Sequence, residues 1–166
     1  MILKHDQTLA DLRSINAANG KLSWIGIRPK HRQAMISQKK AILLENKGIE
    51  GDHIAKNSSR KRQVTLIQEE HLAVVQALVK QDTLYPEFVR RNLVVGGINL
   101  LALKGEQFSI GECVLEGTGL CHPCSRMEEA LGKGGYNAMR GHGGITAVVI
   151  HGGLITLGDS VSLLAK

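Results

Sequence analysis

Short apolar runs separated by glycines and polar turns dominate the second half of the chain. They cover residues 93–95, 99–103, 107–110, 113–116, 145–151, 154–157 and 161–164. Short aliphatic and β-branched runs between turn signals are typical of buried strands. Glycine is favoured in the tight connections between them because it lacks a Cβ atom. This half of the chain is therefore predicted to form β-sheet.

The first half is predicted to combine strands with one long helix. Strands are expected where aliphatic and β-branched residues gather, at 21–27, 40–44 and 62–67, and a turn-rich segment is expected at 48–57. Residues 68–80 have helical periodicity instead, with an apolar face formed by Leu72, Val75, Leu78 and Val79. Such a stripe predicts an amphipathic helix packed on the sheet.

Shorter segments complete the expected fold. Leu9, Leu12 and Ile15 recur at three-residue spacing, which predicts a short N-terminal helix at about 6–17. Residues 125–131 are compatible with a helix, and 132–144 are predicted as a glycine-rich loop. With one long helix, the chain lacks the alternation of strands and helices that a parallel α/β sheet needs. We expect a mostly β barrel with a few short helices, one domain over 1–166 with its core in 20–165.

Composition agrees with a single globular domain. Of the 166 residues, 43% are hydrophobic and 22% are charged, which is usual for a chain that buries one core. No apolar run reaches the length of about 18 residues that a membrane helix needs. Charged residues interrupt 1–16, which lacks the apolar region of a secretory signal. Three cysteines without such a signal do not suggest a disulfide framework, and we expect a reducing cytoplasm.

Positive charge is concentrated in one segment. The chain has a formal net charge of +6, but residues 28–62 hold ten Lys or Arg and only three acidic residues. A local basic excess fits an anionic partner, such as a phosphate-bearing cofactor or nucleic acid, and also fits a solvated surface. Aromatic residues make up only 3% of the chain and are scattered. Nucleic-acid binding is disfavoured because stacking on aromatic side chains is its usual basis.

The sharpest chemical feature is the string Cys121-His122-Pro123-Cys124. A C-x-x-C pair can form half of a zinc site or a redox dithiol, or it can supply one functional cysteine beside a packed one. A zinc site needs four ligands, and no second C-x-x-C or H-x-x-x-H is present. Two small buried cysteines are the remaining alternative.

Cys124 is the better candidate for a single reactive cysteine. It precedes Ser125-Arg126 and the start of the expected helix at 125–131. A helix N-terminus and a neighbouring cation both favour the thiolate over the thiol. The thiolate is the form that binds a metal or carries sulfur.

Arg90-Arg91-Asn92 stands immediately before the apolar run at 93–95. The string fits either a solvated turn or a clamp in which an arginine and the Asn amide hold a phosphate or a polar heterocycle. Arginine suits this task because its planar fork matches phosphate oxygens.

Two glycine-containing strings are further candidates. Gly51-Asp52-His53 lies between Arg28 and Arg62, and Gly141-His142-Gly143-Gly144 precedes the run at 145–151. Either string could be a plain turn. Glycines also allow a loop to approach a ligand closely, which would bring His53 or His142 to it.

Taken together, these strings resemble the MOSC domain family, named for the C-terminal domain of molybdenum cofactor sulfurases. The resemblance spans about 22–164 and rests on the order and spacing of the strings SWIGIRP at 23–29, GIEGDH at 48–53, QVTLI at 63–67, RRNLV at 90–94, FSIG at 108–111, CHPC at 121–124 and GDSV at 158–161. It is greatest to the small bacterial single-domain members. Arg28-Pro29 stands where longer members have a lysine–serine pair.

The resemblance implies a MOSC-type barrel that binds molybdenum cofactor, a molybdopterin. It implies that Cys124 is the metal ligand and the catalytic residue. The implied cofactor-binding residues are Arg28, His53, Arg62, Arg90 and Asn92, and His142 is the candidate for substrate binding. At family level the resemblance also links the chain to pyridoxal phosphate binding.

Two functions follow from this resemblance. The first is a molybdenum-dependent reductase that removes oxygen from N-hydroxylated compounds, a small-molecule substrate class, and receives electrons from a donor protein. The second is a sulfur carrier that holds a persulfide on Cys124 for metal–sulfur cluster or cofactor assembly, loaded by a cysteine desulfurase. Both place the chemistry on the same sulfur atom.

Overall fold

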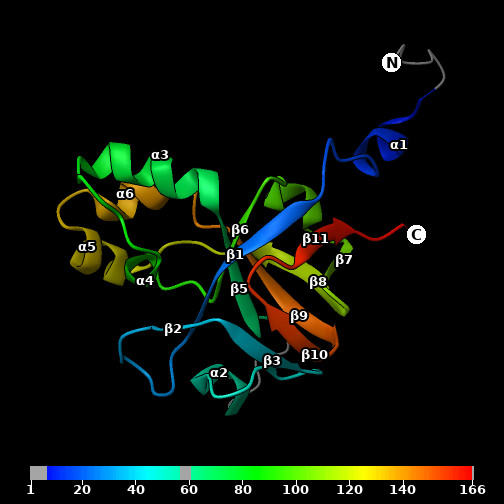
Figure 1. Cartoon of the computed structure of the whole chain (residues 1–166). Helices are drawn as coiled ribbons and strands as arrows, with labels where there is room; N and C mark the ends of the chain where they lie inside the picture. The colour runs from blue at the N-terminus through cyan, green and yellow to red at the C-terminus, as the bar shows by residue number, and fades with distance from the viewer. Residues whose placement is uncertain (1–6, 57–60, 166) are drawn as a thin grey trace.

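The computed structural model describes residues 7–56 and 61–165, and its main feature is a closed barrel of seven strands (Figure 1). The strands that form it are β1 (Gly20–Ile27), β5 (Val64–Gln68), β6 (Leu93–Gly96), β7 (Gln107–Ile110), β8 (Cys113–Leu120), β9 (Ile145–His151) and β11 (Ser160–Leu163). They follow the order β11-β7-β8-β9-β5-β6-β1, and pairing of β1 with β11 closes the ring. The expected mostly β barrel is confirmed.

Six of the seven barrel pairings are antiparallel, and only β5 and β6 are parallel. A short strand, β2 (Ile36–Gln38), extends the sheet at the edge of β1. A second small sheet combines β3 (Lys40–Leu44), β4 (Gly48–Ile49) and β10 (Gly153–Thr156). The register pairs Leu66 with Leu93 and Ile145, and Ile145 with Leu120. The start of β6, the start of β9 and the end of β8 therefore lie at one level.

Apolar side chains fill the barrel, and a second cluster lies under the helices. The barrel cluster includes Phe108, Leu115 and Ile25, all without exposed surface. Its members alternate along the strands with outward residues, as period-two patterning requires. The second cluster joins the outer side of β5 and β6 to α3 (Glu69–Val79), α4 (Pro86–Val89), α5 (Ser125–Leu131) and α6 (Gly135–Met139). This helical layer covers one side of the barrel (Figure 1).

Two segments differ from the sequence-based expectation. The run expected as a strand at 99–103 contains the 3-10 helix η1 (Leu100–Leu103), because the side chains of Asn99 and Gln68 accept the first free amides of the turn. The expected glycine-rich loop contains α6, where the Glu128 carboxylate accepts the amides of Gly134 and Tyr136. In both cases the side chains that accept the first amides lie outside the helical residues themselves. The spacing of apolar residues along the segment therefore does not predict these helical turns.

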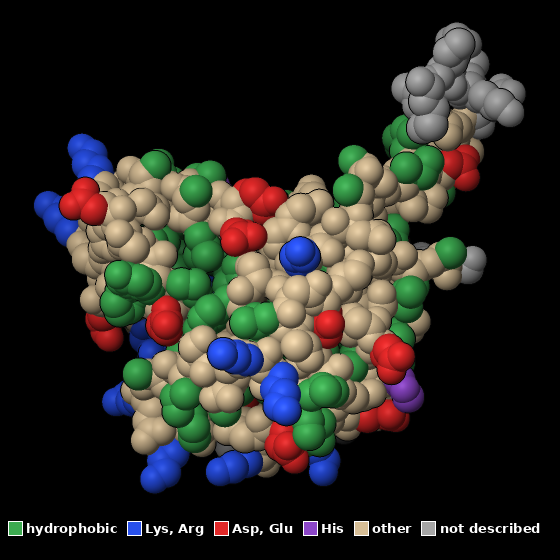
Figure 2. All heavy atoms as spheres, in the orientation of Figure 1, with side chains coloured by type: hydrophobic (Ala, Val, Ile, Leu, Met, Phe, Trp, Pro, Cys, Tyr) green, Lys and Arg blue, Asp and Glu red, His purple; other side chains and the backbone are tan. Residues whose placement is uncertain are grey.

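Two short helices lie at the margins of the fold. In the turn-rich segment, α2 (His53–Lys56) follows the buried Asp52. The N-terminal α1 (Leu9–Arg13) is shorter than the helix expected at 6–17, and Met1–Asp6 lie outside the described residues. Its Thr8 and Asp11 form a capping box. It projects from the barrel (Figure 1). The apolar side chains of Leu9, Leu12 and Ile15 are exposed, and Figure 2 shows apolar side chains at the surface of this projecting segment.

Within the described residues, no helix has the length and apolar character needed to cross a lipid bilayer.

Candidate functional site

The C-x-x-C segment follows directly after β8 and is held by the glycine loop that precedes β9. The amide of Cys121 donates to the Gly144 carbonyl at 2.8 Å, and the side chain of Cys121 is only 1% exposed. The chain then leaves the barrel, and Cys124 becomes the exposed N-cap of α5. The two cysteines therefore have different environments: Cys121 is packed inside the protein, and Cys124 is exposed at the start of α5.

Arg91 fastens three loops to one another. Its guanidinium donates to the carbonyls of Gly143 (2.8 Å), Val89 (2.8 Å) and Cys121 (3.2 Å). The side chain is 3% exposed, and burial lowers the pKa of its guanidinium. Three backbone acceptors offset the cost of burying this charge. Arg91 thereby fixes the C-x-x-C segment and the glycine loop against the end of α4.

Asp52 organises the opposite wall of the site. Its carboxylate, 3% exposed, accepts from the amides of Arg28 (2.9 Å) and Ile54 (3.0 Å) and from Asn92 Nδ2 (3.1 Å). His53 Nδ1 lies 3.2 Å from the same carboxylate. One buried acid thus joins the end of β1, the start of α2 and the turn before β6.

Asn92 lies behind the site, and its side-chain amide is committed to the barrel. Its Oδ1 accepts from the amide and hydroxyl of Thr65, and its Nδ2 donates to Gly26 O and Asp52. All four hydrogen bonds that an Asn amide can make are formed within the protein. The geometry gives Asn92 a positioning role, in contrast to the direct cofactor contact suggested by the sequence.

His53 orients Arg28. Its Nδ1 lies 3.1 Å from the Arg28 carbonyl oxygen as well as near the Asp52 carboxylate, and both are acceptors. With Nδ1 as the donor to these two acceptors, Nε2 can accept from Arg28 Nη2, which lies 3.5 Å away. This contact steers the guanidinium into the adjacent cavity.

These elements enclose a cavity of about 310 Å³, here called the arginine pocket. Five of its lining residues are arginines and none is acidic; the lining comprises Arg28, His31, His53, Ile54, Arg62, Arg90, Arg91, Cys124, Arg126 and Met127. Its volume is in the range of small-molecule and cofactor sites. Cys124, which is exposed, is one of these lining residues.

The positive charge of the arginine pocket favours an anionic ligand. Burial lowers the pKa of Arg28, and the positive charge of Arg90 lowers it further. Burial followed by the charge of Arg126 lowers the pKa of Arg90 in the same way. Arg28 Nε and Arg90 Nη2 are buried without a hydrogen-bond partner among the described residues. An unpaired buried donor costs about 1–3 kcal/mol, and an anion in the pocket would remove that cost.

Most of the residues singled out from the sequence come together here. Arg28, His53, Arg62, Arg90 and Cys124 line the same cavity although they span almost 100 positions of the chain. His142 does not line the pocket. Its Nδ1 lies 2.9 Å from the Ala138 carbonyl, and its ring stacks edge-on against His71 of α3.

Sequence reasoning missed the contribution of several lining residues. His31, Ile54 and Met127 enter from the β1–β2 loop, α2 and α5. Arg91 carried a signal, since it directly follows Arg90, but the sequence does not show that backbone carbonyls accept from its guanidinium. Arg90 has a left-handed backbone conformation (φ 59°) at the end of α4. The described residues contain no cluster of three or more His, Cys, Asp or Glu placed to hold a metal ion.

Gly143→Ala is expected to destabilise the protein by about 1–3 kcal/mol, as overpacking usually does. A Cβ at position 143 would overlap the Cys121 carbonyl oxygen and crowd the Arg91 guanidinium. Urea denaturation would measure the loss. Gly119→Ala is the matched control, because its Cβ would meet only Thr146 Oγ1 at an ordinary 3.7 Å. Equal stability of the two variants would contradict the close approach of the loops.

Comparison with known proteins identifies related sequences and folds. The MOSC domain family model matches residues 49–162. A solved structure of the YuaD protein from Bacillus subtilis is similar, with a TM-score of 0.76 and 17% identity over 90% of this chain and 97% of that one. YiiM from Escherichia coli gives a TM-score of 0.67 and 18% identity over 88% of this chain and 70% of that one. A search of curated proteins finds no significant match.

Proposed function

The chain belongs to the MOSC domain family, and from that premise we propose that the arginine pocket binds molybdenum cofactor with Cys124 as the protein ligand to the metal. The cofactor is a pterin that carries a phosphate and holds molybdenum through sulfur. It therefore requires two features of its site: a sulfur donor for the metal and cations for the phosphate. Both are present at the wall of one cavity.

The residues of the pocket fit this group. Arg28 Nε and Arg90 Nη2, the two buried donors without partners, are suited to phosphate oxygens. Arg62 adds a third guanidinium to the same lining. Cys124 contributes the sulfur from the N-cap of α5, with its side chain exposed and making no capping hydrogen bond. The observation that carries the proposal is that Arg28 and Arg90, each with a buried guanidinium donor that lacks a partner among the described residues, line the same cavity as this cysteine.

We infer that the protein acts as a reductase of N-hydroxylated compounds. In the overall reaction an N-hydroxylamine, two electrons and two protons give an amine and water. Bound molybdenum cofactor would supply the oxygen-atom and electron chemistry, and a donor protein would supply the electrons. The chain's own residues hold the group: Asp52 and His53 orient Arg28, and Arg91 fixes the segment that presents Cys124.

Metal and pterin analysis tests the proposal most directly. The protein would be purified from a host that makes molybdenum cofactor and examined by elemental mass spectrometry and pterin fluorescence. We expect close to one molybdenum and one pterin per chain, and oxidation of a reduced viologen dye when an N-hydroxylated base is added. Protein that carries neither metal nor pterin would contradict the proposal.

A sulfur carrier is the second candidate, favoured by the exposure of Cys124. A carrier thiol must be reached by both a cysteine desulfurase and an acceptor, which a buried cysteine does not allow. Cyanide-releasable sulfur on Cys124, in protein without molybdenum, would support this function. Stoichiometric metal with pterin would support the reductase.

Arg90→Gln is expected to lower the pterin retained after purification by about tenfold, since a hydrogen bond between charged groups contributes on the order of 1.5–3 kcal/mol. The change removes the guanidinium whose Nη2 lacks a partner among the described residues. Arg140→Gln is the control, because Arg140 is exposed and lines neither this pocket nor its neighbour. Similar pterin contents in the two variants would remove Arg90 from the binding set.

A further inference from the structure

A second cavity, of about 530 Å³, adjoins the arginine pocket. We call it the outer pocket; it is lined by Arg32, Arg90, Ser125, Arg126, Glu129 and Ala130. The two cavities share Arg90 and Arg126. Ser125, which lines the outer pocket, directly follows Cys124, which lines the arginine pocket.

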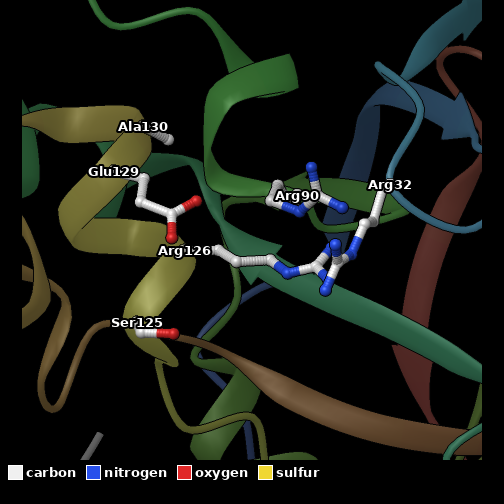
Figure 3. Close-up of a pocket in the computed structure, with 6 residues that line it drawn as sticks. All are labelled: Arg32, Arg90, Ser125, Arg126, Glu129 and Ala130. Atoms are coloured by element: carbon white, nitrogen blue, oxygen red, sulfur yellow. The ribbon is translucent and has the colours of Figure 1, made fainter.

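Three guanidinium groups from different elements point into the outer pocket (Figure 3). Arg32 comes from the loop between β1 and β2, Arg90 from the end of α4 and Arg126 from the first turn of α5. Glu129 is the only acidic residue of the lining. Within the described part of the chain, none of the three arginines forms an ion pair with a carboxylate.

Two energetic costs, charge repulsion and backbone strain, oppose this arrangement of arginines. The charge of Arg126 lowers the pKa of Arg90, after the larger effect of burial, so the cations repel one another. Arg32 and Arg90 also have left-handed backbone conformations, with φ of 69° and 59°. Such strain in residues other than glycine often accompanies a binding site. An anion among the three side chains would reverse the repulsion.

The lining also indicates the kind of anion. Ala130 is the only apolar residue among the six, so the cavity suits a polar group over a bare aromatic ring. Three planar forks around one space match a phosphate, whose oxygens can accept from several guanidinium groups at once. A carboxylate offers fewer acceptor positions. Arg90 lines both cavities, and its five N–H donors are enough for the cofactor phosphate and for a second anion.

We propose that the outer pocket binds the phosphate of the substrate, so that the preferred substrate is an N-hydroxylated nucleotide and not the free base. This inference rests on the proposed reductase function and adds its substrate class. The phosphate is bound but unchanged. At the base, the N–O bond is broken with two electrons from the donor protein and two protons, giving the amine and water.

Binding provides a test that does not depend on turnover. Calorimetry on the purified protein would compare adenosine 5′-monophosphate with adenosine. We expect the nucleotide to bind about tenfold more tightly or better, as one charge-assisted contact provides, and Arg32→Gln to abolish the difference. Arg32 is chosen because it lines only the outer pocket. Lys30→Gln, an exposed change in the same loop, is the matched control and should keep the preference.

Kinetics separate failure of this inference from failure of the proposed function. The protein loaded with cofactor would be assayed with N6-hydroxyadenine, its nucleoside and its nucleoside 5′-monophosphate, using a reduced dye as donor. A kcat/KM at least tenfold higher for the monophosphate, lost in Arg32→Gln, supports the inference. Equal values for all three substrates, or a preference that survives Arg32→Gln, overturn it while leaving the reductase in place. Inactivity on all three contradicts the reductase itself.

Discussion

Cys124→Ser is expected to reduce the molybdenum content of the purified protein at least tenfold and to leave the fold intact. The reason for the loss is chemical, because a serine hydroxyl is a far weaker ligand for a soft metal centre than a thiolate. The fold should tolerate the change because Cys124 is exposed and occupies the N-cap of α5. Serine is among the preferred N-cap residues, and a slight gain in helix stability is expected.

Cys121→Ser is the informative comparison. Cys121 is buried, and its contacts to Arg91 and Gly144 are made by backbone atoms. We expect a milder loss of metal, accompanied by a lower unfolding midpoint because a hydroxyl is placed in an apolar setting. Elemental analysis and urea denaturation of both variants would be read together. Metal loss confined to Cys121→Ser would move the ligand assignment to Cys121, and full metal content in both would remove sulfur ligation altogether.

Arg91→Met is expected to lower the free energy of unfolding by about 2–4 kcal/mol. The change preserves much of the side-chain length but leaves the carbonyls of Val89, Cys121 and Gly143 without their donors. Buried acceptors left unpaired cost on the order of 1–3 kcal/mol each, with partial relief from relaxation and water. Metal retention should fall too, because the segment that presents Cys124 loses its attachment.

Two further variants make the Arg91 prediction specific. Arg91→Lys keeps the charge but cannot reach three carbonyls with a planar fork, so about half of the destabilisation should remain. Arg126→Gln removes a cation of the same pocket that makes no hydrogen bond within the described residues, and its stability should change by about 0.5 kcal/mol or less. The midpoints of urea denaturation, measured for all three variants, test this prediction. An Arg91→Met variant as stable as Arg126→Gln would mean that the three loops are held by other contacts.

The barrel could be predicted because its strands are locally encoded. Short apolar runs between glycines match β7, β9 and β11 closely, and the run at 113–116 matches the first half of β8. Prediction was wrong where a distant side chain decides the conformation. Leu100 begins a 3-10 turn because Gln68, 32 positions away, accepts its amide. No periodicity within 99–103 carries that information.

The candidate site was predictable in its members but not in their roles. Arg90 and Asn92 appear as a single motif in the sequence, yet Arg90 lines the cavity and Asn92 belongs to a buried hydrogen-bond network. Arg91 looks like a second surface cation in the sequence, whereas it is 3% exposed. A buried arginine is recognised only when its backbone acceptors, here from three loops, are placed in space.

The single parallel pairing, between β5 and β6, has a consequence for where this site can be. In a closed barrel with an odd number of strands, neighbouring strands cannot all be antiparallel. At least one neighbouring pair must therefore be parallel. A hairpin can join antiparallel neighbours, but a parallel pair needs a long crossover connection. Between β5 and β6 this connection contains α3 and α4. Arg90 and Arg91 are its last turn before β6. Two of the five arginines that line the pocket, Arg90 and Arg91, therefore lie in the connection that the odd number of strands requires.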